Sequence, residues 1–126
     1  MVDLIYGELS YKLIGILYRI YNTLGPGFQE KYYQRAISKV LARERITFDE
    51  QVKVNLEMNG IKIGRYYIDF VIDNHIVLEI KSKNFFSLKD IKQVLGYLKK
   101  TGLEVGILSA FTSDGIKIKR ILKGNQ

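Results

Sequence analysis

The sequence predicts one α/β domain over residues 1–126, with a mixed central sheet flanked by helices. Two segments with apolar residues at helical spacing open the chain, and the apolar period then changes to two for three strands. A further amphipathic helix precedes two last strands, so the order is α-α-β-β-β-α-β-β. A chain of 126 residues that is 47% hydrophobic and has one Pro can bury one continuous core, which excludes a disordered or low-complexity protein.

Two helices are predicted at the start of the chain. Residues 4–24 place leucines and isoleucines along one face, and residues 28–45 form a similar stripe around Tyr33. Gly25-Pro26-Gly27 separates them, because Pro cannot continue a helix and Gly supplies the positive φ angles of a tight corner. At about 100° per residue, Glu30 falls on the edge of the second stripe, so its carboxylate is expected to face inward.

Three strands are predicted next. Apolar and polar residues alternate over residues 46–58, which is typical of a half-buried strand. Asn59-Gly60 indicates a two-residue hairpin turn that leads into a strand over residues 62–72. A turn around residues 73–75 then connects this strand to the next one, over residues 76–82.

The last part of the chain is predicted to add a helix and two strands. Ser87-Leu88-Lys89-Asp90 has the layout of a capping box, and Gly102 is the expected C-cap of a helix over residues 88–100. The side chains expected to face inward from this helix are Leu88, Ile91, Val94, Leu95 and Leu98. The apolar run 103–111 is typical of a buried strand, and residues 116–121 alternate like an outer strand.

The absence of Cys and the single His restrict the chemistry. Disulfide frameworks, thiolate zinc sites, cysteine nucleophiles and iron-sulfur clusters are excluded, and His75 alone cannot form a His-rich metal site. His75 is interpreted as a turn residue, so any metal must be bound by carboxylates. Charged residues interrupt the first 24 positions, which argues against a signal peptide or a membrane span and predicts a cytoplasmic protein.

The net charge of +7 is concentrated in the second part of the chain. Residues 1–75 hold 10 Lys and Arg against 9 Asp and Glu, whereas residues 76–126 hold 10 against 4. This asymmetry favours a polyanionic partner, most commonly nucleic acid, although a solvated Lys-rich surface explains it equally well. Phe85 and Phe86 follow Lys81-Ser82-Lys83, a mixture that suits bent or single-stranded nucleic acid, and a dimer contact is the alternative.

Asp69, Glu79 and Lys81 are charged residues within strands that are otherwise almost wholly apolar. Burying a lone charge is costly, so each requires a partner. If a three-residue turn follows position 72, Asp69 lies opposite Glu79 and both share a face with Lys81. Opposed carboxylates repel unless a cation lies between them, and Mg²⁺ fits because it takes hard oxygen ligands. A salt bridge of Lys81 with either carboxylate on a solvated sheet face is the alternative.

Several blocks of the sequence resemble one protein family. The segment Gly27-Phe28-Gln29-Glu30-Lys31-Tyr32-Tyr33 resembles the head motif of the GxxExxY proteins, a small bacterial and archaeal family placed in the PD-(D/E)XK nuclease superfamily. The resemblance extends from about residue 9 to residue 122. Its other blocks are Tyr67-Ile68-Asp69-Phe70-Val71, Glu79-Ile80-Lys81, Gln93-Val94-Leu95-Gly96-Tyr97-Leu98-Lys99 and residues 101–108. Family members often carry Asn-Phe after the fourth strand, where this chain has Ser109-Ala110-Phe111, which leaves the role of the C-terminal loop open.

The resemblance implies a restriction-endonuclease-like core with a metal-dependent site. Asp69, Glu79 and the carbonyl of Ile80 would bind Mg²⁺, with Mn²⁺ as the alternative ion. Lys81 would position or activate the attacking water.

Helical residues would complete the site that the resemblance implies. Glu30 would be a further ligand, direct or through water, and Gln93 would line the site. The role of Gln93 depends on the resemblance alone, because a solvated helix residue explains it otherwise. The residues expected to contact nucleic acid are Lys83, Lys89, Lys92 and Phe85.

The function that these observations favour is metal-dependent hydrolysis of phosphodiester bonds in DNA, by an endonuclease or an exonuclease. A catalytically silent module that keeps this fold for nucleic-acid binding or assembly is the main alternative. A dimeric structural protein with a merely solvated basic face is the third. Resemblance to resolvase-like proteins of this size is also consistent with a homodimer.

Overall fold

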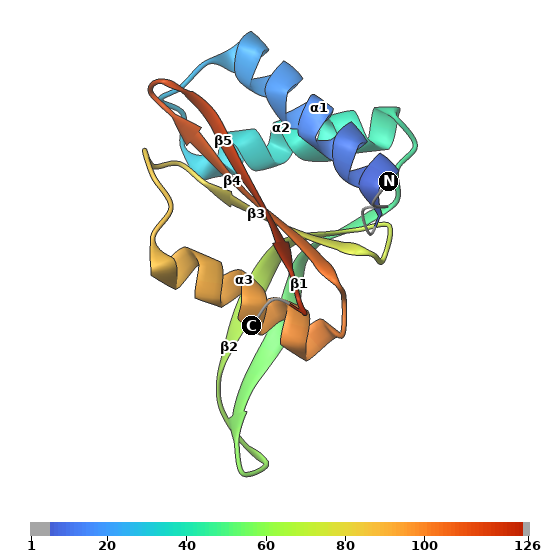
Figure 1. Ribbon diagram of the computed structural model, residues 1–126, viewed down its shortest axis with the longest axis vertical. Coiled ribbons are helices and arrows are strands. Elements are labelled where there is room, and N and C mark those ends of the chain that lie inside the picture. The colour runs from blue at the N-terminus through green and yellow to red at the C-terminus, as the bar shows by residue number, and fades with distance from the viewer. Residues whose placement is uncertain (1–5, 125–126) are drawn as a thin grey trace.

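The computed structural model describes residues 6–124 and contains the predicted elements in the predicted order (Figure 1). The helices are α1 (Gly7–Leu24), α2 (Glu30–Arg43) and α3 (Leu88–Thr101). The strands are β1 (Phe48–Met58), β2 (Ile61–Ile72), β3 (Ile76–Lys81), β4 (Val105–Thr112) and β5 (Gly115–Leu122). The first helix was predicted to begin at residue 4, and positions 4 and 5 lie outside the described residues.

The strands form one mixed sheet in the order β1-β2-β3-β4-β5. β3 and β4 are parallel, and the other neighbouring pairs are antiparallel. Parallel neighbours need a crossover connection, and α3 supplies it between β3 and β4. The prediction of an α/β domain with a mixed sheet flanked by helices is therefore confirmed.

Helices cover both faces of the sheet (Figure 1). α1 and α2 pack on one face, where the buried side chains of the sheet include Phe70, Leu78 and Ile80. α3 packs on the other face, where a second apolar cluster includes Ile68 and Leu98. None of the helices within residues 6–124 is long and apolar enough to span a membrane.

The predicted corner and caps are present. Gly25 and Gly27 have φ angles of 75° and 97°, and Asn59 and Gly60 form the hairpin turn with φ angles of 51° and 81°. α3 begins with the predicted capping box and ends at Gly102, which is in the left-handed conformation. These local signals determined where the elements begin and end because each requires a specific residue type.

One inward residue of α3 was predicted wrongly. Leu88 is 65% exposed, whereas Tyr97, which was not predicted to face inward, is buried. Leu88 lies six residues before Val94, so at about 100° per residue its side chain is about 120° around the helix from the buried stripe.

The β1–β2 hairpin extends beyond the rest of the molecule (Figure 1). Val52 and Val54 pack against the cluster below α3, but Leu56 and Met58, farther along β1, are exposed. The half-buried alternation predicted for β1 is therefore correct only near the body of the protein, because no helix covers the outer part of the hairpin.

Gly106 of β4 allows α3 to approach the sheet closely. A Cβ atom at this position would lie 2.4 Å from Cγ1 of Val94, which real Cβ atoms essentially never do. The glycine therefore sets the distance between α3 and the sheet, and with it the position of Gln93 beside β3.

Candidate active site

β2 and β3 pair in the register that a three-residue turn predicts. The paired residues are Phe70 with Leu78, Val71 with Val77, and Ile72 with Ile76. The next two positions in this register are Asp69 and Glu79. The paired region ends directly beside these two residues. The register is therefore consistent with the prediction that Asp69 and Glu79 face each other across neighbouring antiparallel strands.

The carboxyl groups of Asp69 and Glu79 each accept a hydrogen bond from the backbone of the opposite strand. The Asp69 N–H donates to Oε1 of Glu79 at 2.9 Å, and the Ile80 N–H donates to Oδ2 of Asp69 at 2.9 Å. Both carboxyl groups therefore lie in the same gap between β2 and β3, and the backbone of Ile80 adjoins them.

Asp69 lies at an irregular point of the sheet. Ile68 belongs to the apolar cluster below α3, whereas Phe70 belongs to the cluster below α1 and α2. Residues two apart in a regular strand share a face, so β2 changes face at Asp69. Gln51, within β1, has a φ angle of 50°, which is uncommon for a non-glycine residue and often accompanies functional sites.

Burial raises the pKa values of both carboxyl groups. For Glu79, desolvation and then the charge of Asp69 raise the pKa to about 8. For Asp69, desolvation outweighs the hydrogen bond from the Ile80 N–H, and the charge of Glu30 also raises the pKa. The charge of Lys81 lowers both pKa values without cancelling the effect of burial, so at neutral pH the pair retains a proton.

The two carboxyl groups fit a divalent cation. They are hard oxygen ligands, and a bound cation would favour their ionised forms, which desolvation at both groups and the charge of Asp69 at Glu79 now disfavour. Within residues 6–124, no group of three or more His, Cys, Asp or Glu side chains is arranged to hold a metal. Backbone carbonyl and water oxygens would have to complete the coordination, which is common for Mg²⁺.

Gln34 contacts the pair and was missed by the sequence prediction. Its Nε2 donates to Oδ1 of Asp69 at 2.9 Å, and its Oε1 accepts a hydrogen bond from Nε2 of Gln51 at 3.3 Å. Gln34 follows Glu30 by four residues in α2, so the two share a face of the helix. This spacing of four residues from Glu30 was the signal in the sequence that could have identified Gln34 as a site residue.

Glu30 lies at the first position of α2, and its side chain is half-buried. Oε1 of Glu30 accepts a hydrogen bond of 3.0 Å from the N–H of Ser82, just beyond the end of β3. Its charge contributes to the raised pKa of Asp69, so the head of α2 does face the candidate site. It does not form a three-carboxylate group with Asp69 and Glu79.

Lys81 and Gln93 are in direct contact. Nζ of Lys81 donates to Oε1 of Gln93 at 3.2 Å and lies 4.0 Å from Oδ1 of Asp90. Asp90 also forms a salt bridge with Lys83. Desolvation raises the pKa of Asp90, but the hydrogen bonds from Lys83 and Ser87 outweigh it, so the pKa is below its usual value.

Two further residues adjoin Glu79. Oγ of Ser109 on β4 donates to the carbonyl oxygen of Glu79 at 3.1 Å, and both residues are buried. Tyr97 of α3 is buried too, and desolvation followed by the charge of Glu79 raises the pKa of its phenol. Ser109 therefore supports the backbone of β3 behind the carboxyl pair.

The expected nucleic-acid contacts divide into two groups. Lys83, Lys89 and Lys92 line a groove of about 640 Å³ between the β1–β2 hairpin and α3, which Lys81 and Gln93 also line. Phe85 is not among the lining residues and is 68% exposed.

Comparisons with known proteins found a matching family and a similar solved structure. The family model of the PD-(D/E)XK nuclease superfamily matches residues 7–121. A solved structure titled "Crystal structure of SSO0001" is similar with a TM-score of 0.59 and 25% sequence identity, covering 76% of this chain and 50% of that chain. The chain thus spans about half the length of that protein. No curated protein matches the sequence significantly.

Proposed function

Because the chain belongs to the PD-(D/E)XK nuclease superfamily, we propose that it is a metal-dependent hydrolase of phosphodiester bonds in DNA, and a GxxExxY protein within that superfamily. The observation that carries this proposal is that the buried carboxyl group of Glu79 and the half-buried carboxyl group of Asp69 share one gap between β2 and β3. Such a pair destabilises the metal-free fold, since apolar residues would fill the same space without the cost of desolvation. A bound cation would offset this cost and would explain why the chain has two carboxyl groups at this place.

Asp69, Glu79 and the carbonyl oxygen of Ile80 would hold Mg²⁺ or Mn²⁺. When bound, the ion would polarise the phosphate and acidify a water molecule. Gln34 fixes the orientation of the Asp69 carboxyl group through its hydrogen bond of 2.9 Å. Ser109 holds the backbone of Glu79 through its carbonyl oxygen.

Lys81 would stabilise the negative charge that develops on the phosphate and orient the attacking water. Its side chain is about one-fifth exposed, so its charge acts in a partly desolvated site. Gln93 and Asp90 restrict where the ammonium group lies, and both belong to α3, whose start is held by the capping box. Gln93 is therefore proposed as a positioning residue for Lys81.

Glu30 is proposed to act at the end of β3. Its carboxylate holds the N–H of Ser82, the residue directly after Lys81. In this position it can bind a water molecule that belongs to the metal site, or it can fix the chain next to Lys81. The substitution Glu30→Gln separates these roles, because the amide oxygen still accepts the Ser82 hydrogen bond but carries no charge.

The experiment that tests the proposal compares cleavage and metal binding in the same variants. The purified protein is incubated with linear duplex, single-stranded and branched DNA and with RNA, in Mg²⁺, Mn²⁺ or chelator. We expect Lys81→Met to lower the cleavage rate by about 10² to 10³ with unchanged Mn²⁺ affinity in calorimetry. Asp69→Asn should weaken both, since a neutral amide is a poorer ligand for a hard cation. Lys12→Met, on α1, is the matched control and should change neither.

Two outcomes would overturn the proposal. Absence of cleavage on every substrate together with absence of Mn²⁺ binding would remove the metal site. Nucleic-acid binding without cleavage in either metal, unaffected by Lys81→Met or Asp69→Asn, would make the protein a catalytically silent binding module.

A further inference from the structure

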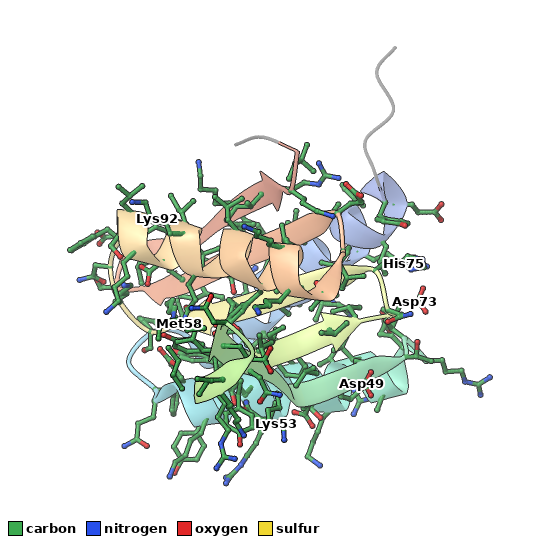
Figure 2. The ribbon with its side chains drawn as sticks, turned by 90° about the horizontal axis from the view of Figure 1, so that it is seen from below. Asp49, Lys53, Met58, Asp73, His75 and Lys92 are labelled. Carbon is green, nitrogen blue, oxygen red and sulfur yellow. The ribbon has the colours of Figure 1, made fainter. Side chains whose placement is uncertain are left out.

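The groove between the β1–β2 hairpin and α3 is built from two kinds of surface. The hairpin contributes Val54, Leu56 and Tyr66, and α3 contributes a lysine-rich wall. Its volume of about 640 Å³ lies within the range of roughly 300 to 1,000 Å³ usual for ligand pockets. Figure 2, seen from the hairpin end, shows Lys92 on α3 on one side of the hairpin and Lys53 on the opposite side.

The positive charge of the groove is only partly balanced. Five lysines line it, Lys81, Lys83, Lys89, Lys92 and Lys100, against one carboxylate, that of Asp90. Asp90 is engaged with Lys83 and lies 4.0 Å from Lys81. Lys89, Lys92 and Lys100 form no salt bridge with any residue in the range 6–124. A polyanion would complement these three charges.

Gly96 lies in the middle of the lysine stripe on α3. Positions 89, 92, 96 and 100 follow one another at intervals of three and four residues, so they share one helix face. Gly96 is exposed in the helix interior, where Ala would be more favourable, and a Cβ atom there would meet nothing within 4 Å. Internal packing explains Gly106 but does not explain Gly96, so the open space is available to a ligand that approaches the helix closely.

Tyr66 offers an aromatic surface on the opposite wall. It is 48% exposed, and its ring contacts that of Tyr97 edge-on, with centroids 6.4 Å apart and planes at 62°. This contact restricts the Tyr66 ring while leaving part of it open to the groove. Nucleobases stack on such rings, but in a duplex the faces of the bases are already stacked on one another.

We infer that this groove binds an unpaired nucleic-acid strand, with a base stacked on Tyr66 and phosphates along Lys89, Lys92 and Lys100, and with the strand passing over Gly96. The inference rests on the proposed function, since the groove continues to Lys81 and Gln93 and would lead the strand to the cleavage site. It defines the substrate class as nucleic acid with an unpaired segment, such as a single-stranded tail, in preference to a blunt duplex.

Binding is tested without cleavage, in chelator. Fluorescence anisotropy measures the affinity of the full chain for a labelled (dT)12 oligonucleotide and for a blunt hairpin duplex. We expect tighter binding of the oligonucleotide. Tyr66→Ala should weaken it by about 5- to 100-fold through the loss of one stacked base, whereas Tyr11→Ala, at an exposed tyrosine of α1, should not.

Two pairs of matched variants test the helical wall. Gly96→Leu should weaken oligonucleotide binding at least tenfold by filling the groove, whereas Gly15→Leu, at an exposed and equally uncrowded glycine of α1, should leave it unchanged. The double variant Lys89→Ala/Lys92→Ala should reduce the slope of log K against log salt by about 1.4, at about 0.7 per phosphate contact on a single strand. A matched double variant, Lys12→Ala/Lys39→Ala, should not change the slope.

Tryptophan fluorescence reports stacking directly, because the chain has no Trp. In Tyr66→Trp the emission should be quenched when (dT)12 binds, and in Tyr11→Trp it should not.

If the duplex binds as tightly as the oligonucleotide without quenching, or if polyglutamate displaces the oligonucleotide and binds as tightly, the inference is wrong. Cleavage of a blunt duplex with unaltered activity in Gly96→Leu would end this inference and leave the proposed function intact. If the oligonucleotide binds with quenching but the protein cleaves nothing, the inference about the groove stands and the proposed function fails.

Discussion

Gln34 donates a hydrogen bond to the Asp69 carboxyl group across 35 positions of the sequence. The bond joins α2 to β2 at the point where β2 changes face. Gln51 of β1 in turn donates a hydrogen bond to the amide oxygen of Gln34. A carboxyl group in that position has one oxygen held by Gln34 and the other by the N–H of Ile80. Its orientation is therefore determined by three separate elements before any metal binds.

Removing the Gln34 amide should weaken the proposed metal site without unfolding the protein. We predict that Gln34→Ala lowers Mn²⁺ affinity by about 10- to 100-fold, the usual effect of losing a group that orients a metal ligand. Titration calorimetry measures the affinity. Ser38→Ala, one turn later on α2, is the control and should retain the wild-type value. Equal affinities in Gln34→Ala and the wild type would show that the Ile80 N–H alone orients Asp69.

Metal affinity should increase with pH. The pKa of Glu79 is raised to about 8 by burial and by Asp69, so below this pH a cation must displace a proton. We predict that the apparent affinity for Mn²⁺ rises about tenfold per pH unit from pH 6 and levels off near pH 8. Calorimetry in two buffers of different ionisation enthalpy should show proton release at pH 7. An affinity that does not change over this range would contradict the shared proton.

The metal-free protein should lose stability over the same pH range. The Glu79 side chain has a pKa of 4.5 when unperturbed and about 8 in the folded state. Between these values the folded state keeps a proton that the unfolded state has released, so the free energy of unfolding decreases as pH rises. We predict that Glu79→Gln, which stays neutral, is more stable than the wild type at pH 8 by an amount on the order of 2 kcal/mol. The gain should be small at pH 5.

Urea denaturation in chelator at both pH values measures this effect. Glu57→Gln, at an exposed position of β1, is the control and should not alter the pH dependence. A loss of stability in Glu79→Gln that is equal at pH 5 and pH 8 would mean that hydrogen bonding, and not ionisation, dominates at this position.

Gly106 should not accept a side chain. We predict that Gly106→Ala lowers the free energy of unfolding by about 1 to 3 kcal/mol, because the added methyl group would overlap Val94 and this β-branched side chain cannot easily rotate away. Combining it with Val94→Ala should cost less than the sum of the two single changes. Gly64→Ala, on β2 with open space around it, is the control. Additive losses in the double variant would exclude a direct overlap.

Much of the fold follows from local sequence signals. Helical and alternating periods, the Gly25-Pro26-Gly27 corner, Asn59-Gly60 and the capping box at Ser87 placed every element to within a few residues. Each of these signals acts over a few residues, so it is readable without knowledge of the partner elements. The register of β2 and β3 depends on the length of the turn after position 72, which the sequence left open between two and three residues, and the structure has the register of the three-residue turn.

The candidate site was predictable where charge interrupts an apolar strand. Asp69, Glu79 and Lys81 were identifiable from the residues alone because a buried charge requires a partner. Gln93 was identifiable only by family resemblance, and the structure places it against Lys81. Gln34 was not identified, since a glutamine on a helix is usually solvated and only its contact with Asp69 distinguishes it.

The tertiary structure alone decided which distant groups meet. The sequence by itself determined the elements, their order and the excess of positive charge after residue 75. It did not determine that the head of α2 holds Ser82, that α3 and the protruding hairpin form a groove lined by five lysines, or that Leu88 is exposed. Those outcomes depend on how far apart packed elements lie and how they are rotated. Contacts such as that of Gly106 with Val94 set these quantities, and no local pattern records them.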